Sequence, residues 1–197
     1  LQGNQGLSQK GKEPGNASYY YSFTRMIASG EVTTPQGTFD VTGLSWLDRE
    51  WSTSVLESNQ VGWDWFALQL NDGTDLMYYQ LRDREGKPDK QSSGKLVNPN
   101  GESRNLNFEE VALQVVEFWK SPKSGASYPA GWTLKLASEN LDLEISPRMS
   151  DQELQTTVSY WEGSVRVQGT QNGQPIQGVG YVEMTGYDQF MTSVDES

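Results

Sequence analysis

The sequence predicts an all-β protein, built as an antiparallel meander β-barrel with little helix. The 20 Gly and 8 Pro residues are scattered between short runs rich in Val, Thr, Trp and Tyr, the residue types that favour strands. Helix signatures are scarce, and several apolar runs follow one another with turn residues between them. About eight to ten strands in 197 residues fit a barrel or a sandwich, and the consecutive hairpins favour the barrel.

The predicted elements cover most of the chain. Residues 1–17 are rich in Gly, Gln, Asn and Lys without periodicity, and we interpret them as an extended lead-in or linker. Residues 18–190 are predicted to form the barrel, and residues 191–197 a C-terminal tail. The runs with strand signatures are 18–29, 38–42, 44–51, 61–70, 75–82, a weak one at 95–97, 111–119, 132–137, 141–145, 160–168 and 177–185.

Local patterns justify the turns and the buried faces. Asp72-Gly73 and Asn172-Gly173 each stand between two strand-like runs, which is a strong hairpin signal. In run 141–145, Leu and Ile alternate with acidic residues, so one face should lie in a core and the other in water. Run 111–119 has apolar residues on both parities. It indicates a strand buried on both faces, with a short helix as the alternative.

Composition excludes several function classes. The 15 basic and 26 acidic residues give a net charge of −11, which repels a phosphate backbone and argues against nucleic-acid binding. Because the chain has no Cys and no His, it cannot build a thiol nucleophile, a Ser-His-Asp triad or a His-ligated metal site. We therefore expect neither a metal nor a cofactor. Any catalytic proton must be carried by a carboxyl group, Tyr, Lys or water.

Tryptophan is unusually frequent, and it clusters in the middle of the chain. The 7 Trp residues include Trp46, Trp63 and Trp65, which could fill a core or line a ligand pocket together with Tyr79. In run 46–51, strand parity places Trp46, Asp48 and Glu50 on one face. The two carboxyls could form a catalytic acid pair, or they could belong to a salt-bridged barrel end with Arg49.

Asp64 is an acidic residue on an apolar face, because it shares its strand parity with Phe66, Leu68 and Leu70. Inside a closed barrel, desolvation would raise the pKa of Asp64 and keep it protonated, as a general acid requires. The alternative is that Asp64 begins its strand and is neutralised by Arg49, by Arg82 or by a cap.

Several strings of the sequence resemble the AttH and carotenoid 1,2-hydratase (hydroxyneurosporene synthase) family. They span almost the whole chain in order: GLSQKG at 6–11, EPGNASYYYS at 13–22, WLDREW at 46–51, GWDWFALQL at 62–70, SP at 121–122, YWEG at 160–163, and GY to TGY at 180–187. The resemblance implies a lipocalin-like barrel. It also implies a protein with two such units in tandem, of which this chain resembles the second, so the family's N-terminal lipocalin-like unit is an expected partner.

The resemblance also implies what the barrel does. The hydratase branch adds water to an isoprenoid double bond, which needs an acid such as Asp64 and aromatic faces to steady a carbocation. The AttH branch consists of exported or lipid-attached proteins, often labelled predicted secreted hydrolases, which implies a secreted, periplasmic or envelope location, with an anchor outside this chain. Because this chain has no His, a hydratase site that relies on imidazole could not be built here, and this favours the exported branch.

Three functions remain open from the sequence. The first is a barrel that binds a hydrophobic small molecule and hydrates an isoprenoid-type double bond. The second is a non-catalytic exported binding or accessory module. The third is carbohydrate binding or cleavage, with Asp48 and Glu50 as the carboxyl pair.

Overall fold

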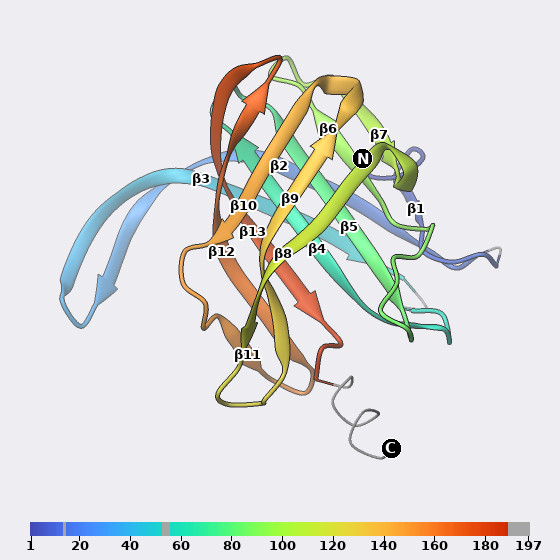
Figure 1. Ribbon diagram of the computed structural model, residues 1–197. Helices are drawn as coiled ribbons and strands as arrows, with labels where there is room; N and C mark the ends of the chain where they lie inside the picture. Colours follow the sequence, from blue (N-terminus) through green and yellow to red (C-terminus); the bar gives the residue numbers. More distant parts are fainter. Residues whose placement is uncertain (14, 53–55, 189–197) are drawn as a thin grey trace.

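A computed structural model describes residues 1–13, 15–52 and 56–188, which form two antiparallel sheets (Figure 1). The predicted tail at 191–197 and the last two residues of the predicted barrel lie outside the described residues. The strands are β1 (Leu7–Gln9), β2 (Ala17–Thr34), β3 (Gly37–Trp51), β4 (Gln60–Leu70), β5 (Asp75–Asp83), β6 (Ser93–Val97), β7 (Ser103–Asn107), β8 (Val111–Lys120), β9 (Ser127–Leu136), β10 (Leu141–Pro147), β11 (Glu153–Gln155), β12 (Ser159–Gln171) and β13 (Gln174–Thr185). Two 3-10 turns, η1 (Phe108–Glu110) and η2 (Ala137–Glu139), precede β8 and β10.

The larger sheet has ten strands and curls around one core, which confirms the lipocalin-like antiparallel meander barrel. Its order is β7-β6-β5-β4-β13-β12-β10-β9-β8, with β11 paired to β12. Most neighbours in this order are also consecutive in the chain, as in a meander. The exceptions are the pairing of β10 with β12, between which β11 lies in the chain, and the pairing of β13 with β4, which joins the last strand to the first strand of this sheet.

The inner face of the curled sheet is filled by apolar side chains. Alternation along β4 turns Phe66, Leu68 and Leu70 inward, where they are buried. Trp132 and Trp161 are 0% exposed and meet edge to face at 6.3 Å between ring centroids. The interior is therefore a packed core rather than a wide ligand cavity.

The two hairpin turns predicted from Asp72-Gly73 and Asn172-Gly173 are present. Asn172 and Gly173 both have positive φ, 50° and 76°, as a two-residue turn between twisted strands requires. Gly73 has φ 93° and donates its N–H to the carbonyl of Leu70.

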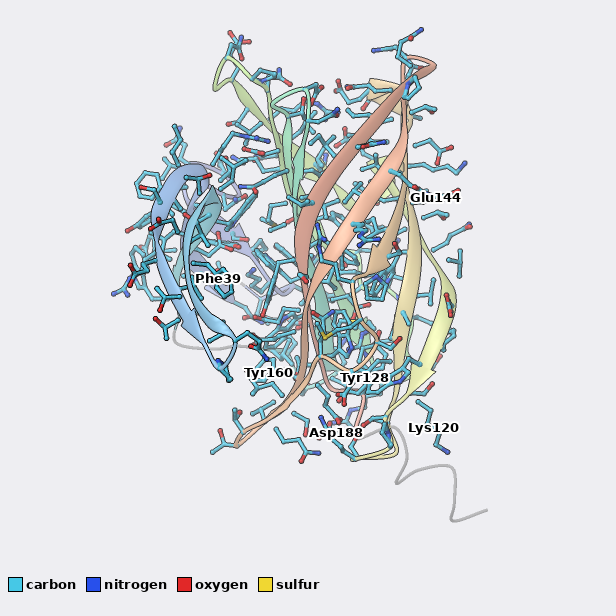
Figure 2. The ribbon with its side chains drawn as sticks, turned by 90° about the vertical axis from the view of Figure 1, so that its left-hand side faces the viewer. Phe39, Lys120, Tyr128, Glu144, Tyr160 and Asp188 are labelled. Carbon is cyan, nitrogen blue, oxygen red and sulfur yellow. The ribbon has the colours of Figure 1, made fainter. Side chains whose placement is uncertain are left out.

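The smaller sheet consists of a long hairpin, β2–β3, and the short strand β1. The hairpin unites the three runs that were predicted separately at 18–29, 38–42 and 44–51. Its base lies against the outer face of the barrel, where Tyr20, Met77, Tyr79 and Leu81 form a second buried cluster. Its far part, which includes Phe39, projects away from the barrel as a free-standing arm (Figures 1 and 2).

The structure differs from the sequence prediction at several elements, among them the short strand β11, which was not predicted. The lead-in at 1–17 is folded, because β1 pairs with β2 and Ser8 is buried. Strand β7 was not predicted, since its sequence is polar and only Leu106 is buried. Residues 111–120 form strand β8, as the sequence favoured, but the strand is not buried on both faces. Val116 and Phe118 are 63% and 62% exposed, because no described residue covers the outer side of this edge strand.

Candidate pocket between the hairpin and the barrel

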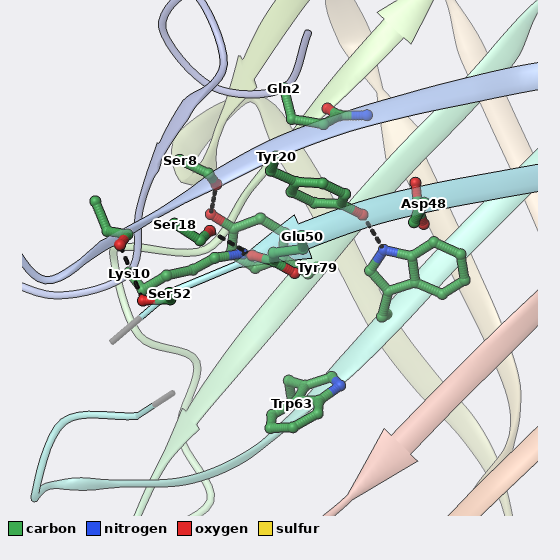
Figure 3. A network of polar contacts seen from close by, with 12 residues as sticks. Gln2, Ser8, Lys10, Ser18, Tyr20, Asp48, Glu50, Ser52, Trp63 and Tyr79 are labelled. Atoms are coloured by element: carbon green, nitrogen blue, oxygen red, sulfur yellow. Dashed lines mark hydrogen bonds and ion pairs between the residues drawn. The ribbon is translucent and has the colours of Figure 1, made fainter. Parts of the chain in front are cut away.

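A pocket of about 350 Å³ lies between the base of the β2–β3 hairpin and the outer face of the barrel (Figure 3). The hairpin contributes Tyr20, Asp48 and Glu50, and the loop after β1 contributes Lys10. The barrel contributes side chains of β4, β5 and β13, including Trp63, Trp65, Tyr79 and Glu183. The pocket therefore exists only because the hairpin folds back over the sheet.

Aromatic side chains form much of the wall of the pocket. Along β4, Trp63 and Trp65 alternate with the inward residues, so their rings lie on the outer face. The indole N–H of Trp65 donates to the hydroxyl of Tyr20 at 3.0 Å. Trp46 does not line the pocket but packs edge to face on Trp65, at 6.3 Å between ring centroids. This contact helps to fix the orientation of the Trp65 ring.

Lys10 ties the loop after β1 to the hairpin. Its ammonium lies 3.0 Å from the carboxylate of Glu50 and 3.7 Å from the ring centroid of Tyr79 (Figure 3). Glu50 also accepts a hydrogen bond from the hydroxyl of Ser18. The tyrosine ring is itself fixed, because its hydroxyl bonds with that of Ser8 at 3.0 Å.

Two carboxyls of the pocket, Asp48 and Glu183, have raised pKa values. Burial raises the pKa of Asp48, although the hydrogen bond from Ser22 and the nearby polar groups of Trp46 and Tyr20 oppose the shift. Burial also raises the pKa of Glu183, and repulsion from Glu162, Asp48 and Glu50 adds to this.

The indole N–H of Trp63 donates to the Glu183 carboxyl at 2.7 Å and lowers its pKa in part. The pocket thus combines an ion-paired carboxylate, Glu50, with two carboxyls that hold a proton more readily than usual.

Asp64 lies on the opposite face of β4, inside the barrel and away from the pocket. It is 1% exposed and accepts hydrogen bonds from Arg82 Nε at 3.2 Å and from the Tyr187 hydroxyl at 3.0 Å. Burial raises the pKa of Asp64, whereas Arg82 and Tyr187 lower it. Arg82 was one of the partners considered from the sequence, and the geometry is that of a buried ion pair next to a packed core.

The structure therefore brings together part of the predicted set. Asp48, Glu50, Trp63, Trp65 and Tyr79 line one pocket, whereas Asp64 is separated from them by the sheet. The face shared by Trp46, Asp48 and Glu50 agrees with strand parity.

Sequence reasoning missed Lys10, Tyr20 and Glu183 as pocket residues. Lys10 lies in the segment interpreted as a linker. Glu183 alternates with the inward residues Val182 and Met184 as any solvent-facing residue would, so no local signal distinguished it.

Neither a metal centre nor a membrane helix is found in the described part of the chain. No group of three or more Asp and Glu residues there is arranged to hold a metal ion. No helix described is long and apolar enough to cross a membrane.

The fold and the pocket define a class: a lipocalin-like β-barrel with a side pocket closed by a hairpin. The family model for AttH-like proteins matches residues 1–187, and the chain belongs to this family.

Relatives with known structures or names support the family and the fold. The chain superimposes on the crystal structure of a candidate AttH protein from Nitrosomonas europaea with a TM-score of 0.85 and 37% identity, over 95% of this chain and 57% of the other. Kievitone hydratase from Nectria haematococca has the same fold, with a TM-score of 0.74, 20% identity, and coverage of 94% of this chain and 57% of the other.

In sequence, the chain is 24% identical to kievitone hydratase from Fusarium solani subsp. phaseoli over 174 residues, which is 85% of this chain and 49% of that protein. The chain therefore spans about half the length of these relatives.

Proposed function

We propose that the pocket binds an apolar small molecule and adds water to an isoprenoid-type carbon–carbon double bond in it. The observation that carries the proposal is the meeting of two carboxyls of raised pKa, Asp48 and Glu183, with the aromatic wall of one pocket. The relation to kievitone hydratase supports hydration as the reaction class. Because this chain corresponds to about half of that relative, the activity of the whole protein is part of the proposal.

Glu183 is the general acid in this scheme. Its carboxyl accepts a hydrogen bond from the Trp63 indole, and three acidic neighbours favour its protonated form. It transfers its proton to the less substituted carbon of the double bond, and the π electrons form the new C–H bond. The positive charge that remains on the more substituted carbon is stabilised by the faces of the surrounding indole and phenol rings.

Glu50 accepts the second proton. A water molecule attacks the cationic carbon, the C–O bond forms, and the excess proton of that water passes to the Glu50 carboxylate. Lys10 and Ser18 both bond to Glu50, which orients this carboxylate before the reaction. The proton then returns from Glu50 to Glu183 through solvent, so that the sum of the steps is the addition of one water.

The test is turnover of an apolar alkene with an isoprenoid group in oxygen-18-labelled water, followed by mass spectrometry of the product. Glu183→Gln should lower kcat by about 10² to 10⁴, the usual contribution of a general acid. Glu144→Gln is the matched control, because Glu144 is an exposed glutamate on β10 that accepts a hydrogen bond from Gln168 and lies far from the pocket residues in the sheet. Equal loss in both variants, or no loss in either, would remove Glu183 from the mechanism.

Asp64→Asn separates this scheme from the one in which Asp64 is the acid. Since Asp64 faces the core, its replacement should leave turnover per folded molecule unchanged. Loss of turnover in a folded Asp64→Asn protein would return the acid role to Asp64. Tight binding of the alkene without incorporation of labelled oxygen would instead favour the non-catalytic binding module.

A further inference from the structure

The ion pair of Lys10 shows what kind of charge the pocket accommodates. The Lys10 ammonium lies 3.7 Å from the ring centroid of Tyr79 and 5.2 Å from that of Tyr20, and its side chain is only 12% exposed. An ammonium above two electron-rich rings and beside a carboxylate is a favourable arrangement. The positively charged side chain of Lys10 therefore lies inside this pocket.

The remaining wall is arranged for a cation as well. Among the described lining residues, three are acidic, Asp48, Glu50 and Glu183, and Lys10 alone is basic. The repulsion between these carboxyls is relieved when a positive charge enters. Trp63 and Trp65 supply two further ring faces, and Leu56 and Leu81 supply apolar surface for substituents.

We infer that the pocket is a binding site for an organic cation with apolar substituents. The charge of such a ligand would take the place near the rings and Glu50 that the Lys10 ammonium occupies in the structure. The inference rests on the pocket used in the proposed function and narrows its ligands to those that carry one positive charge or acquire it on protonation. A neutral ligand of the same shape gains the contact with the apolar wall but not the attraction to the rings and carboxyls. Removal of the Lys10 charge should make the site more attractive to an external cation.

The experiment compares choline with dimethylbutanol, its neutral analogue in which a quaternary carbon replaces the nitrogen. Binding is followed by tryptophan fluorescence, because Trp63 and Trp65 line the site. Choline should bind at least about tenfold more tightly than its analogue. Lys10→Met should raise the affinity for choline about tenfold and change the affinity for dimethylbutanol by much less.

Lys135→Met is the control for the overall charge, since Lys135 is an exposed lysine of β9 that pairs with Asp142. It should not change choline binding beyond about twofold. Glu50→Gln should act in the opposite direction to Lys10→Met and weaken choline binding, which keeps the test decisive if the Lys10 variant does not fold.

Equal affinities for choline and dimethylbutanol, or equal effects of Lys10→Met and Lys135→Met, would overturn the inference. A clear preference for choline in a protein that never hydrates an alkene would support the cation site while the proposed function fails. Hydration without any preference for choline would do the reverse.

Discussion

Arg25 fixes the middle of the hairpin to the barrel, alongside Gln69, whose side-chain amide donates to the carbonyl of Thr24. Replacement of Arg25 should therefore loosen the pocket. Its guanidinium donates to Asp75 from Nε at 3.1 Å and from Nη2 at 2.5 Å, and to the carbonyl of Leu70 at 3.0 Å. The Asp75 side chain is 3% exposed and the Arg25 side chain 29% exposed. Arg25→Met would leave the Asp75 carboxylate buried without its cation.

The expected loss can be worked from these bonds. A hydrogen bond to a charged group contributes about 1.5–3 kcal/mol to the free energy of unfolding. Because the Arg25 side chain is partly exposed, its bonds together should contribute no more than the upper value for one such bond, about 2–3 kcal/mol. With an m value of about 2.5 kcal/mol/M, the urea midpoint should fall by about 1 M. Alkene or choline binding should weaken as well, because the hairpin carries one wall of the pocket.

Urea unfolding followed by fluorescence measures this loss. The control is Arg49→Met, which removes an exposed arginine from the same hairpin. Asp75→Asn completes a double-mutant cycle, in which the coupling with Arg25→Met should be about 2 kcal/mol. If Arg25→Met and Arg49→Met agree within about 0.5 kcal/mol, the bonds of Arg25 do not hold the hairpin, and the reasoning fails.

Three further predictions concern the pocket and the core. Because the pKa of Glu183 is raised above its ordinary value of 4.5, the stability that it contributes is complete at low pH and is lost as the pH rises through the raised pKa. The wild type should therefore lose unfolding free energy relative to Glu183→Gln as the pH increases above about 4.5, by up to about 1.4 kcal/mol per pH unit, and parallel curves would refute the shift. Trp63→Phe removes the donor that lowers the pKa of Glu183, so the alkaline limb of the hydration profile should move up by about one pH unit; an unmoved limb would exclude Glu183. Trp161→Ala should cost about 3–5 kcal/mol in urea unfolding, since Trp161 is fully buried, and a loss below about 1 kcal/mol would contradict a packed interior.

Sequence reasoning could predict the barrel because its signals are local. Alternation in run 141–145 and the Asn172-Gly173 turn depend only on neighbours in the chain, and both predictions are confirmed. The strand pairing of β13 with β4 joins residues more than a hundred positions apart, and no local pattern reports it.

The pocket was only partly predictable for the same reason. Strand parity placed Asp48 and Glu50 on one face, as the structure does. Parity cannot say which face of β4 receives the hairpin, so Asp64 was expected in one site with Trp63 and Trp65, although the structure places it on the opposite face of β4. Lys10 reaches the pocket through a loop, where periodicity gives no information.

The free-standing arm of the hairpin has a consequence for local stability. Beyond the Ile27–Leu44 pair, β2 and β3 pair only with each other among the described strands, up to the turn between Thr34 and Gly37. An isolated two-stranded ribbon is marginally stable in water. Hydrogen exchange should therefore replace the amide protons of Val32 and Phe39 long before those of β4, which is bonded to β5 on one side and β13 on the other.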